Sequence, residues 1–327
     1  MRVLYLFIFA CAAAQIATAQ DAGDLSANQI VQNSITYSGG KAALSKINTL
    51  ELIYLYLDPE GKSASIIEKR KANTNFTQSI ISQNHESQTT FYSGTDIVWV
   101  RGNSVRKLND SGRPEIKLKA FPNIQLAYES LGYSYSRLRD EKFENFDCYV
   151  VEAKNNGGYA TRNFFDKASF KHLMTVYPDG NKSLMIEDTI VDGVKLTKHI
   201  LNTDNEGKIS QMILVDARIN SSISDLWFTS PFTGAFILPQ DIKHGKFRAE
   251  GSGTVINRNE KTQTEESGGK SMAFSVDWKT DDMFELRTPE QLKGEGTVVR
   301  IVSWNKDGYI CHVMGLANIG TAEYKRI

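Results

Sequence analysis

Histidines and carboxylates are the side chains of this sequence with which acid–base or metal chemistry could begin. The five histidines are dispersed, and none lies within four residues of another: His85, His172, His199, His244 and His312. Helical zinc hydrolases place two histidines four residues apart, as in H-E-x-x-H, and that spacing does not occur here. The nucleophile elbow G-x-S-x-G of α/β-hydrolases is absent as well. The sequence therefore predicts no metal site and no hydrolase motif.

Adjacent carboxylates occur at Glu265-Glu266 and at Asp281-Asp282. Successive side chains of a β-strand point to opposite faces of the sheet, so neither pair is placed to work as an acid and a base on one substrate. We interpret both pairs as solvated surface residues and expect a non-enzymatic protein without a cofactor. A hydrolase with an unrecognised site is the remaining alternative.

The first nineteen residues have the features of a signal peptide. Arg2 provides a positive start, residues 3–14 are apolar, and residues 17–19 form an A-x-A cleavage site. No later stretch holds eighteen consecutive apolar residues, so we expect no transmembrane segment in the mature chain. We therefore expect export across the inner membrane of a Gram-negative cell, to the periplasm or to a place associated with the outer membrane.

We predict that the mature chain begins at Gln20, because the A-x-A site directly precedes it. The alternative is a lipobox at residues 8–11, which would place a lipidated Cys11 at the N-terminus. The intact mass of the exported protein distinguishes the two. A mass that begins at Cys11 and includes acyl chains would contradict the prediction.

Charge and cysteine content limit the possible partners and cross-links. The sequence holds 38 Lys and Arg against 38 Asp and Glu, and this balance argues against nucleic acid as a partner. Cleavage at Gln20 leaves only Cys148 and Cys311, which fall in separate predicted domains. We expect two buried free thiols, and a disulfide between them is the alternative in an oxidising compartment.

One helical segment opens the mature chain, a second interrupts it, and strands make up most of the rest. Ser26 and Gln29 form a capping box at the start of the first helix, which ends at Gly39-Gly40. The second helical pattern covers residues 121–131, and elsewhere the apolar residues follow a period of two. The predicted strands of the first part cover residues 50–57, 63–71, 76–82, 88–93, 97–101, 148–153, 161–165, 173–177, 184–189, 194–201 and 208–219.

Two prolines, Pro231 and Pro239, flank a break in this rhythm of strands. A shorter β module follows, with strands predicted at residues 245–249, 254–258, 272–278, 284–287, 298–304, 309–314 and 322–325. The predicted organisation is a signal peptide over residues 1–19, a first domain over 20–235 and a small all-β domain over 240–327. We expect the two domains to fold independently.

The first predicted strand, residues 50–57, is apolar on both faces, so both faces must be covered. Because few helices are available, a curved sheet could keep an apolar cavity on its concave side, which is the usual setting for a lipid. A filled core is the alternative, and periodicity alone favours it. The residues expected to bind a ligand in such a cavity are Leu52, Tyr54, Tyr56, Trp99, Ile124, Tyr128 and Leu131.

Four segments, in order, resemble outer-membrane lipoprotein-sorting, LolA-like proteins. Residues 35–50, ITYSGGKAALSKINTL, are similar to the family's helix, Gly-Gly and ALxKI turn before its first strand. Residues 163–169, NFFDKAS, resemble its YYID-x-x-T strand and turn, and residues 191–196, VDGVKL, resemble its DGVKLP hairpin, with Thr197 in place of the proline. Residues 215–228 resemble its closing strand, with the usual asparagine displaced to Asn220.

This resemblance covers residues 25–232 and implies a mainly β, α+β fold: an open antiparallel half-barrel wrapped on helices. In that family the apolar concave face holds lipoprotein acyl chains or other lipids, so the resemblance favours the cavity over the filled core. We therefore expect a lipid- or lipoprotein-binding protein, and we expect its second domain to contact envelope proteins. The alternative is an envelope scaffold or sensor with a filled core. Residues 240–327 resemble no family that we recognise.

Overall fold

The computed structural model describes residues 25–71, 74–82, 87–94, 96–101, 104–108, 113–228, 238–293, 295–315 and 319–327. The predicted signal peptide, Cys11, Gln20, His85 and Pro231 lie outside these residues. Within them no helix is long and apolar enough to cross a membrane.

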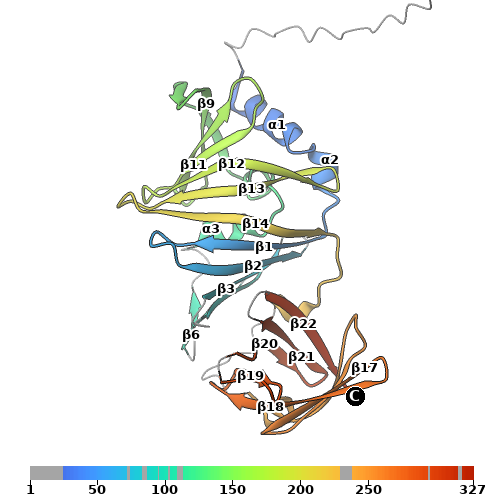
Figure 1. Cartoon of the computed structure of the whole chain (residues 1–327). Helices are drawn as coiled ribbons and strands as arrows, with labels where there is room; N and C mark the ends of the chain where they lie inside the picture. The colour runs from blue at the N-terminus through green and yellow to red at the C-terminus, as the bar shows by residue number, and fades with distance from the viewer. Residues whose placement is uncertain are drawn as a thin grey trace, which may run out of the picture.

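A large antiparallel sheet forms the first part of the protein and confirms the predicted half-barrel (Figure 1). Its strands follow the order β6-β5-β4-β3-β2-β1-β14-β13-β12-β11-β10-β9-β7, with β8 paired to β9. The two ends of the sheet do not pair, so the half-barrel stays open. Its strands are β1 (Thr49–Leu57), β2 (Ser63–Lys71), β3 (Asn75–Ser82), β4 (Ser87–Ser93), β5 (Ile97–Arg101), β6 (Ser104–Leu108), β7 (Ser134–Arg137), β8 (Glu141–Phe143), β9 (Phe146–Lys154), β10 (Ala160–Asp166), β11 (His172–Val176), β12 (Lys182–Val191), β13 (Val194–Thr203) and β14 (Ile209–Ile219).

Helices cover much of the concave face. The helices are α1 (Ala27–Tyr37), α2 (Lys41–Leu44), α3 (Pro114–Lys119) and α4 (Ile124–Ser130). The predicted capping box is present, since the Ser26 hydroxyl accepts from the Gln29 amide and the Gln29 side chain accepts from the Ser26 amide. The apolar side of α1 then packs on alternate residues of β1, among them Leu50 and Leu52. This packing closes one end of the half-barrel.

The second helical region differs from its prediction. The sequence pattern favours one helix over residues 121–131, whereas the chain forms α3 and then α4, which starts only after Asn123. The Asn123 side chain accepts from the amides of Gln125 and Leu126 and so fixes the start of α4. The sequence signal for α3 was Pro114, which suits the first turn of a helix because it lacks an amide hydrogen there.

A closed barrel of eight strands forms the second part, in the order β15 to β22. Residues 262–267 form a strand that the sequence analysis missed, because alternating Thr, Gln and Glu carry no apolar signal. A short helix, α5 (Gln240–Lys243), precedes the barrel. Its strands are β15 (Gly245–Ala249), β16 (Val255–Arg258), β17 (Thr262–Ser267), β18 (Lys270–Trp278), β19 (Met283–Arg287), β20 (Thr297–Asn305), β21 (Gly308–Met314) and β22 (Ile319–Arg326).

A buried arginine organises the barrel core. Arg258 is 2% exposed and lies against aromatic rings, with its guanidinium carbon 4.6 Å from the centre of the Phe284 ring. It donates to the carbonyls of Ile242 and Lys243 and to the Tyr309 hydroxyl. These contacts compensate the positive charge of Arg258 and connect α5 to the barrel. The barrel interior is therefore filled by side chains.

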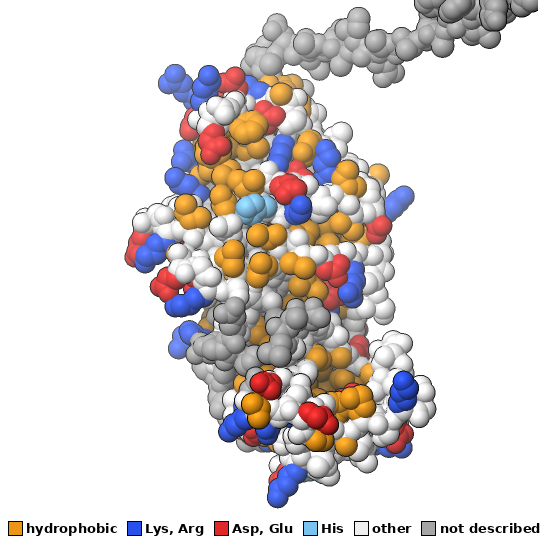
Figure 2. All heavy atoms as spheres, viewed as in Figure 1, with side chains coloured by type: hydrophobic (Ala, Val, Ile, Leu, Met, Phe, Trp, Pro, Cys, Tyr) orange, Lys and Arg blue, Asp and Glu red, His pale blue; other side chains and the backbone are white. Residues whose placement is uncertain are grey.

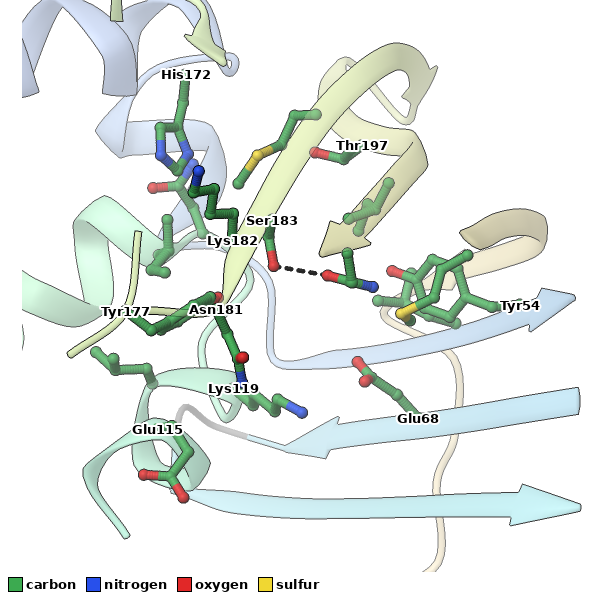
Figure 3. A pocket seen from close by; sticks show the side chains of 18 of the residues that line it. Tyr54, Glu68, Glu115, Lys119, His172, Tyr177, Asn181, Lys182, Ser183 and Thr197 are labelled. Carbon is green, nitrogen blue, oxygen red and sulfur yellow. Dashed lines mark hydrogen bonds between the residues drawn. The ribbon is translucent and has the colours of Figure 1, made fainter. Parts of the chain in front are cut away.

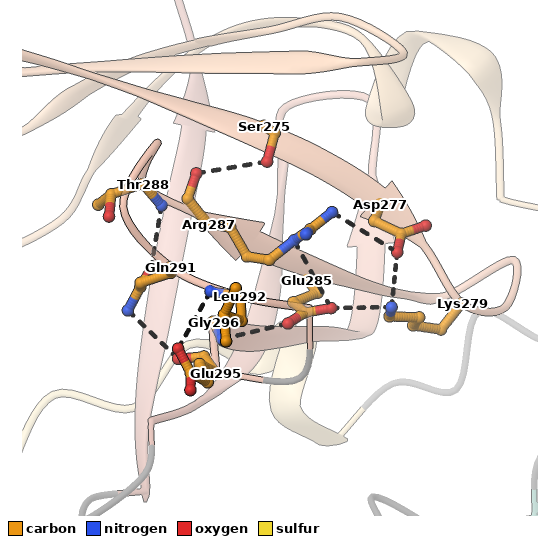
Figure 4. A network of polar contacts seen from close by, with 10 residues as sticks. All are labelled: Ser275, Asp277, Lys279, Glu285, Arg287, Thr288, Gln291, Leu292, Glu295 and Gly296. Atoms are coloured by element: carbon orange, nitrogen blue, oxygen red, sulfur yellow. Dashed lines mark hydrogen bonds and ion pairs between the residues drawn. The ribbon is translucent and has the colours of Figure 1, made fainter.

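A polar network holds the loop between β19 and β20 (Figure 4). The Glu285 side chain, 1% exposed, accepts from the Gly296 amide and lies 2.8 Å from the Lys279 ammonium. Lys279 also contacts Asp277 at 2.6 Å, and this contact lowers the pKa of the Asp277 carboxyl. Glu285 and Asp277 thus have a structural role, since they hold the loop against β18 and β19.

The half-barrel and the barrel meet at a contact that we call the joint. On the half-barrel it comprises the convex-face residues of β2 to β5, Ile223 and the short helix η2 (Asp225–Phe228). On the barrel it comprises outward residues of β20 and β21. Its buried apolar residues are Ile67, Ile81, Phe91, Val100, Ile223, Trp227, Phe228, Val298, Val302, Ile310 and Met314. In Figure 1 the barrel, in orange and red, accordingly lies beside β3.

Cys148 and Cys311 are both buried and free, as expected. The predicted division between residues 235 and 240 falls next to residues 229–237, which lie outside the described chain. That the two parts fold independently therefore stays a prediction.

Candidate functional site

A cavity of about 950 Å³ lies on the concave face of the half-barrel. Strands β1, β2, β12, β13 and β14 form its floor, and α3, α4 and the turns at residues 178–183 and 203–208 surround it. The volume is within the range of about 300–1,000 Å³ that is typical of small-molecule sites. Figure 3 shows the cavity from close by, with Tyr54, Tyr177 and Lys119 approaching it from different elements.

An apolar row crosses the floor of this cavity. Tyr56 on β1 pairs in register with Met212 on β14, Met212 pairs with Ile200 on β13, and Ile200 pairs with Met185 on β12. All four side chains line the cavity and are half-buried. In an antiparallel sheet such neighbours lie about 5 Å apart, so they form a continuous strip roughly 15 Å long. This strip, the floor row, gives hydrocarbon an unbroken surface.

Apolar side chains also form the deep end and one wall. Leu52 and Tyr54 on β1 are 3% and 6% exposed, and burial raises the pKa of the Tyr54 phenol well above its usual value. The opposite wall consists of Leu118 and Phe121 with Ile124 at the start of α4. The cavity therefore presents apolar surface on two sides.

Buried charge lies on the β2 side of the floor. Burial by itself would raise the pKa of the Glu68 carboxyl, but Arg70 at 2.7 Å and the nearby Lys119 hold that pKa below its usual value. The Gln78 amide donates a second hydrogen bond to Glu68, also at 2.7 Å. Glu68 is consequently ionised and fully engaged, and it offers a ligand little free hydrogen-bonding capacity.

A second polar group lies beside the end of α1. The Tyr37 hydroxyl donates to Asp188 at 3.0 Å, and burial together with this contact raises the pKa of Tyr37 to about 12. Lys171 lies 3.4 Å from the same carboxylate. The Lys195 ammonium sits 3.5 Å from the centre of the Tyr37 ring and has no ion pair within the described chain. Lys195 thus offers a positive charge at this side of the cavity.

A polar row runs beside the floor row. The Ser183 hydroxyl donates to the Asn202 side chain at 2.6 Å, and Ser210 follows in register on β14 (Figure 3). The cavity is therefore amphipathic, with a hydrocarbon surface next to groups that can accept and donate hydrogen bonds. The sequence analysis expected the apolar part alone.

His172 also lines the cavity, but it is not poised for proton transfer near neutral pH. Burial lowers the pKa of its imidazole to about 4, so the ring is neutral at pH 7. Its Nε2 lies 3.0 Å from the Thr175 hydroxyl oxygen and 3.2 Å from the Met174 carbonyl oxygen. Within the described residues no group of three His, Cys, Asp or Glu side chains could hold a metal ion.

The structure brings together four of the seven residues predicted to bind a ligand. Leu52, Tyr54, Tyr56 and Ile124 all line the cavity. The floor residues on β12, β13 and β14 were missed, although their strands were predicted. Met185, Ile200 and Met212 each lie in a continuous apolar run, so the sequence does not show which residues of the run face the cavity.

The other three predicted residues do not line the cavity. Tyr128 lies on the buried side of α4, and its hydroxyl lies 2.8 Å from the Thr161 hydroxyl oxygen. Leu131 is 37% exposed just past the end of α4. Trp99 lies on β5, 5.8 Å from the Arg106 guanidinium. These placements leave β1, β12, β13, β14 and the start of α4 as the candidate binding surface.

No family model matches the sequence, and no curated protein matches it. Solved structures with a similar fold include a LolA superfamily protein from Nitrosomonas europaea, at 16% identity and a TM-score of 0.46, covering 63% of this chain and 98% of that one. A second is an outer membrane lipoprotein-sorting protein domain from Vibrio parahaemolyticus, at 14% identity and a TM-score of 0.42, covering 61% and 97%.

A third match is the complex of MucA and MucB from Pseudomonas aeruginosa, at 9% identity and a TM-score of 0.24, which covers 90% of this chain and 92% of that chain. A LolA superfamily protein is thus among the solved structures to which this chain is similar.

Proposed function

We propose that this chain is a non-enzymatic binding protein of the Gram-negative envelope that holds the acyl part of a lipid or lipoprotein in its concave cavity. The observation that carries the proposal is the floor row, four half-buried apolar side chains in register across four strands. Half-buried apolar side chains gain free energy when hydrocarbon covers them, at roughly 25 cal/mol per Å². A filled core would leave no such space.

The polar part of the cavity suits the other end of such a ligand. An acyl chain on the floor row would leave its ester or head group near the polar row of Ser183 and Asn202 or near Lys195. The barrel, whose interior is filled, would then serve as a module that contacts envelope proteins rather than as a second ligand site.

Native mass spectrometry of the protein purified from its own envelope tests the proposal. We expect a mass excess equal to one lipid or acylated species, which organic extraction removes. The control is the same protein refolded without lipid, which should show the polypeptide mass alone. Identical polypeptide masses for the two preparations would contradict the proposal.

A further inference from the structure

The joint contains a buried histidine whose surroundings accept only its neutral form. On β21, Tyr309 and Cys311 point into the barrel core, so Ile310, His312 and Met314 point outward. Ile310 and Met314 belong to the apolar clusters of the joint, and His312 lies between them. The half-barrel therefore covers His312, which is 0% exposed.

Among the residues that the structure describes, the His312 ring has no acceptor for a second proton. Within the described residues neither ring nitrogen of His312 has a hydrogen-bond partner. Its aromatic neighbour from η2 is Trp227, with ring centres 5.4 Å apart. A neutral imidazole packs against this ring, but an imidazolium would be a buried charge without a counter-ion, which is costly.

The charged groups around His312 add to that cost. From β20, Arg300 is its cross-strand partner, and Arg300 is already paired with Asp282 at 2.8 Å. From β2, the Lys69 ammonium lies 4.4 Å from the centre of the Trp227 ring and is paired with Glu51 of β1 at 2.6 Å. The neighbouring strand β22 carries Thr321 opposite His312, and Glu323 lies two residues further on. Asp282 and Glu51 are thus engaged with these cations, and Glu323 makes no hydrogen bond to the His312 ring.

We propose that the joint is an acid-sensitive latch, in which protonation of His312 favours separation of the barrel from the half-barrel. Separation exposes the outward face of β21 to water, where an imidazolium is readily hydrated. The latch is a property of the contact between the two parts and does not depend on whether the cavity binds a lipid.

The direction of the pH effect follows from the difference in the pKa of His312 between the closed and open forms. Burial, with Arg300 and Lys69 nearby, holds the pKa of His312 well below its usual value in the closed form, whereas a hydrated histidine titrates near pH 6.5. Above that pH both forms are neutral and the joint keeps its full stability. Below it only the open form takes up a proton, so closure weakens progressively as the pH falls. Between pH 7.5 and 5.0 the ratio of open to closed molecules should rise about 30-fold.

Small-angle X-ray scattering of the full mature chain measures this ratio. If nearly all molecules are closed, the open form stays too rare to detect even after a 30-fold rise in the ratio of open to closed molecules. The measurement therefore uses Ile81→Ala, which removes joint contacts with Val298 and Met314. If Ile81→Ala alone stays fully closed, Val298→Ala is added. We expect the ratio of open to closed molecules to rise about 30-fold between pH 7.5 and 5.0 in this background.

Adding His312→Gln, or His312→Asn if the first does not fold, should abolish that rise. The matched control is His172→Gln, because His172 is a half-buried histidine whose pKa is also lowered but which lies in the cavity, away from the joint. The control should keep the full pH response. An open fraction that does not change with pH, or a rise that persists without His312, would overturn the proposal.

Discussion

Replacing Met212 with glutamate is expected to weaken acyl binding strongly while leaving the fold intact. Met212 is in the middle of the floor row, between Tyr56 and Ile200, and is half-buried. A carboxylate there hydrates in the open cavity but removes hydrocarbon contacts from a bound chain. Losing contact with three methylenes, at about 0.8 kcal/mol each, corresponds to about 50-fold weaker binding.

Fluorescence titration with an acyl probe and thermal unfolding of the same variant check this prediction together. Val215→Glu is the matched control, because Val215 lies on the same strand, is 68% exposed and does not line the cavity. We expect the control to bind like the wild type. Equal binding by Met212→Glu and the wild type would place the acyl chain elsewhere. Leu52 is less suitable for this test, since it belongs to the buried core and a charge there would destabilise the fold.

Replacing Lys69 with methionine is expected to destabilise the protein by about 3–5 kcal/mol. Lys69 and Glu51 form a buried ion pair at 2.6 Å, with side chains only 5% and 8% exposed. Methionine at position 69 leaves the Glu51 carboxylate buried without its cation. Urea unfolding at pH 7 measures the loss.

The double variant Lys69→Met with Glu51→Leu provides the control for this second prediction. Replacing both members removes the unpaired charge, so most of the lost stability should return. If the urea concentration at the midpoint of unfolding is the same for Lys69→Met and the wild type, the pair of Lys69 and Glu51 does not stabilise the fold. If the double variant is as unstable as the single one, lost packing against Trp227 rather than the unpaired charge explains the effect.

Local signals predicted much of the fold because they act within a few residues. The Ser26 capping box and the turns between the hairpins appear as expected. The second apolar face of β1 is only partly covered, because Leu55 is 36% exposed. The closure of the barrel was not predictable in this way, because it depends on β15 pairing with β22, far apart in the sequence. The joint was missed for the same reason.

The candidate site was predictable only in part, and the failures have physical causes. Leu131 continues the spacing of Ile124 and Tyr128, but α4 ends at Ser130, so the helical period no longer applies to it. Tyr128 packs instead against Phe76 in a cluster that covers the concave face of β3 to β5. The floor row depends on the register of four strands, which spacing along the sequence does not specify.

The most direct test of the central claim is photo-crosslinking with a fatty acid that carries a diazirine on its acyl chain, followed by peptide mass spectrometry. The account predicts saturable labelling of peptides from β1, β12, β13 and β14, at or next to Tyr56, Met185, Ile200 and Met212, and loss of this labelling in the presence of excess unlabelled fatty acid. Labelling confined to the barrel or to the convex face, or labelling that excess fatty acid does not reduce, would contradict the claim that the concave cavity binds an acyl chain.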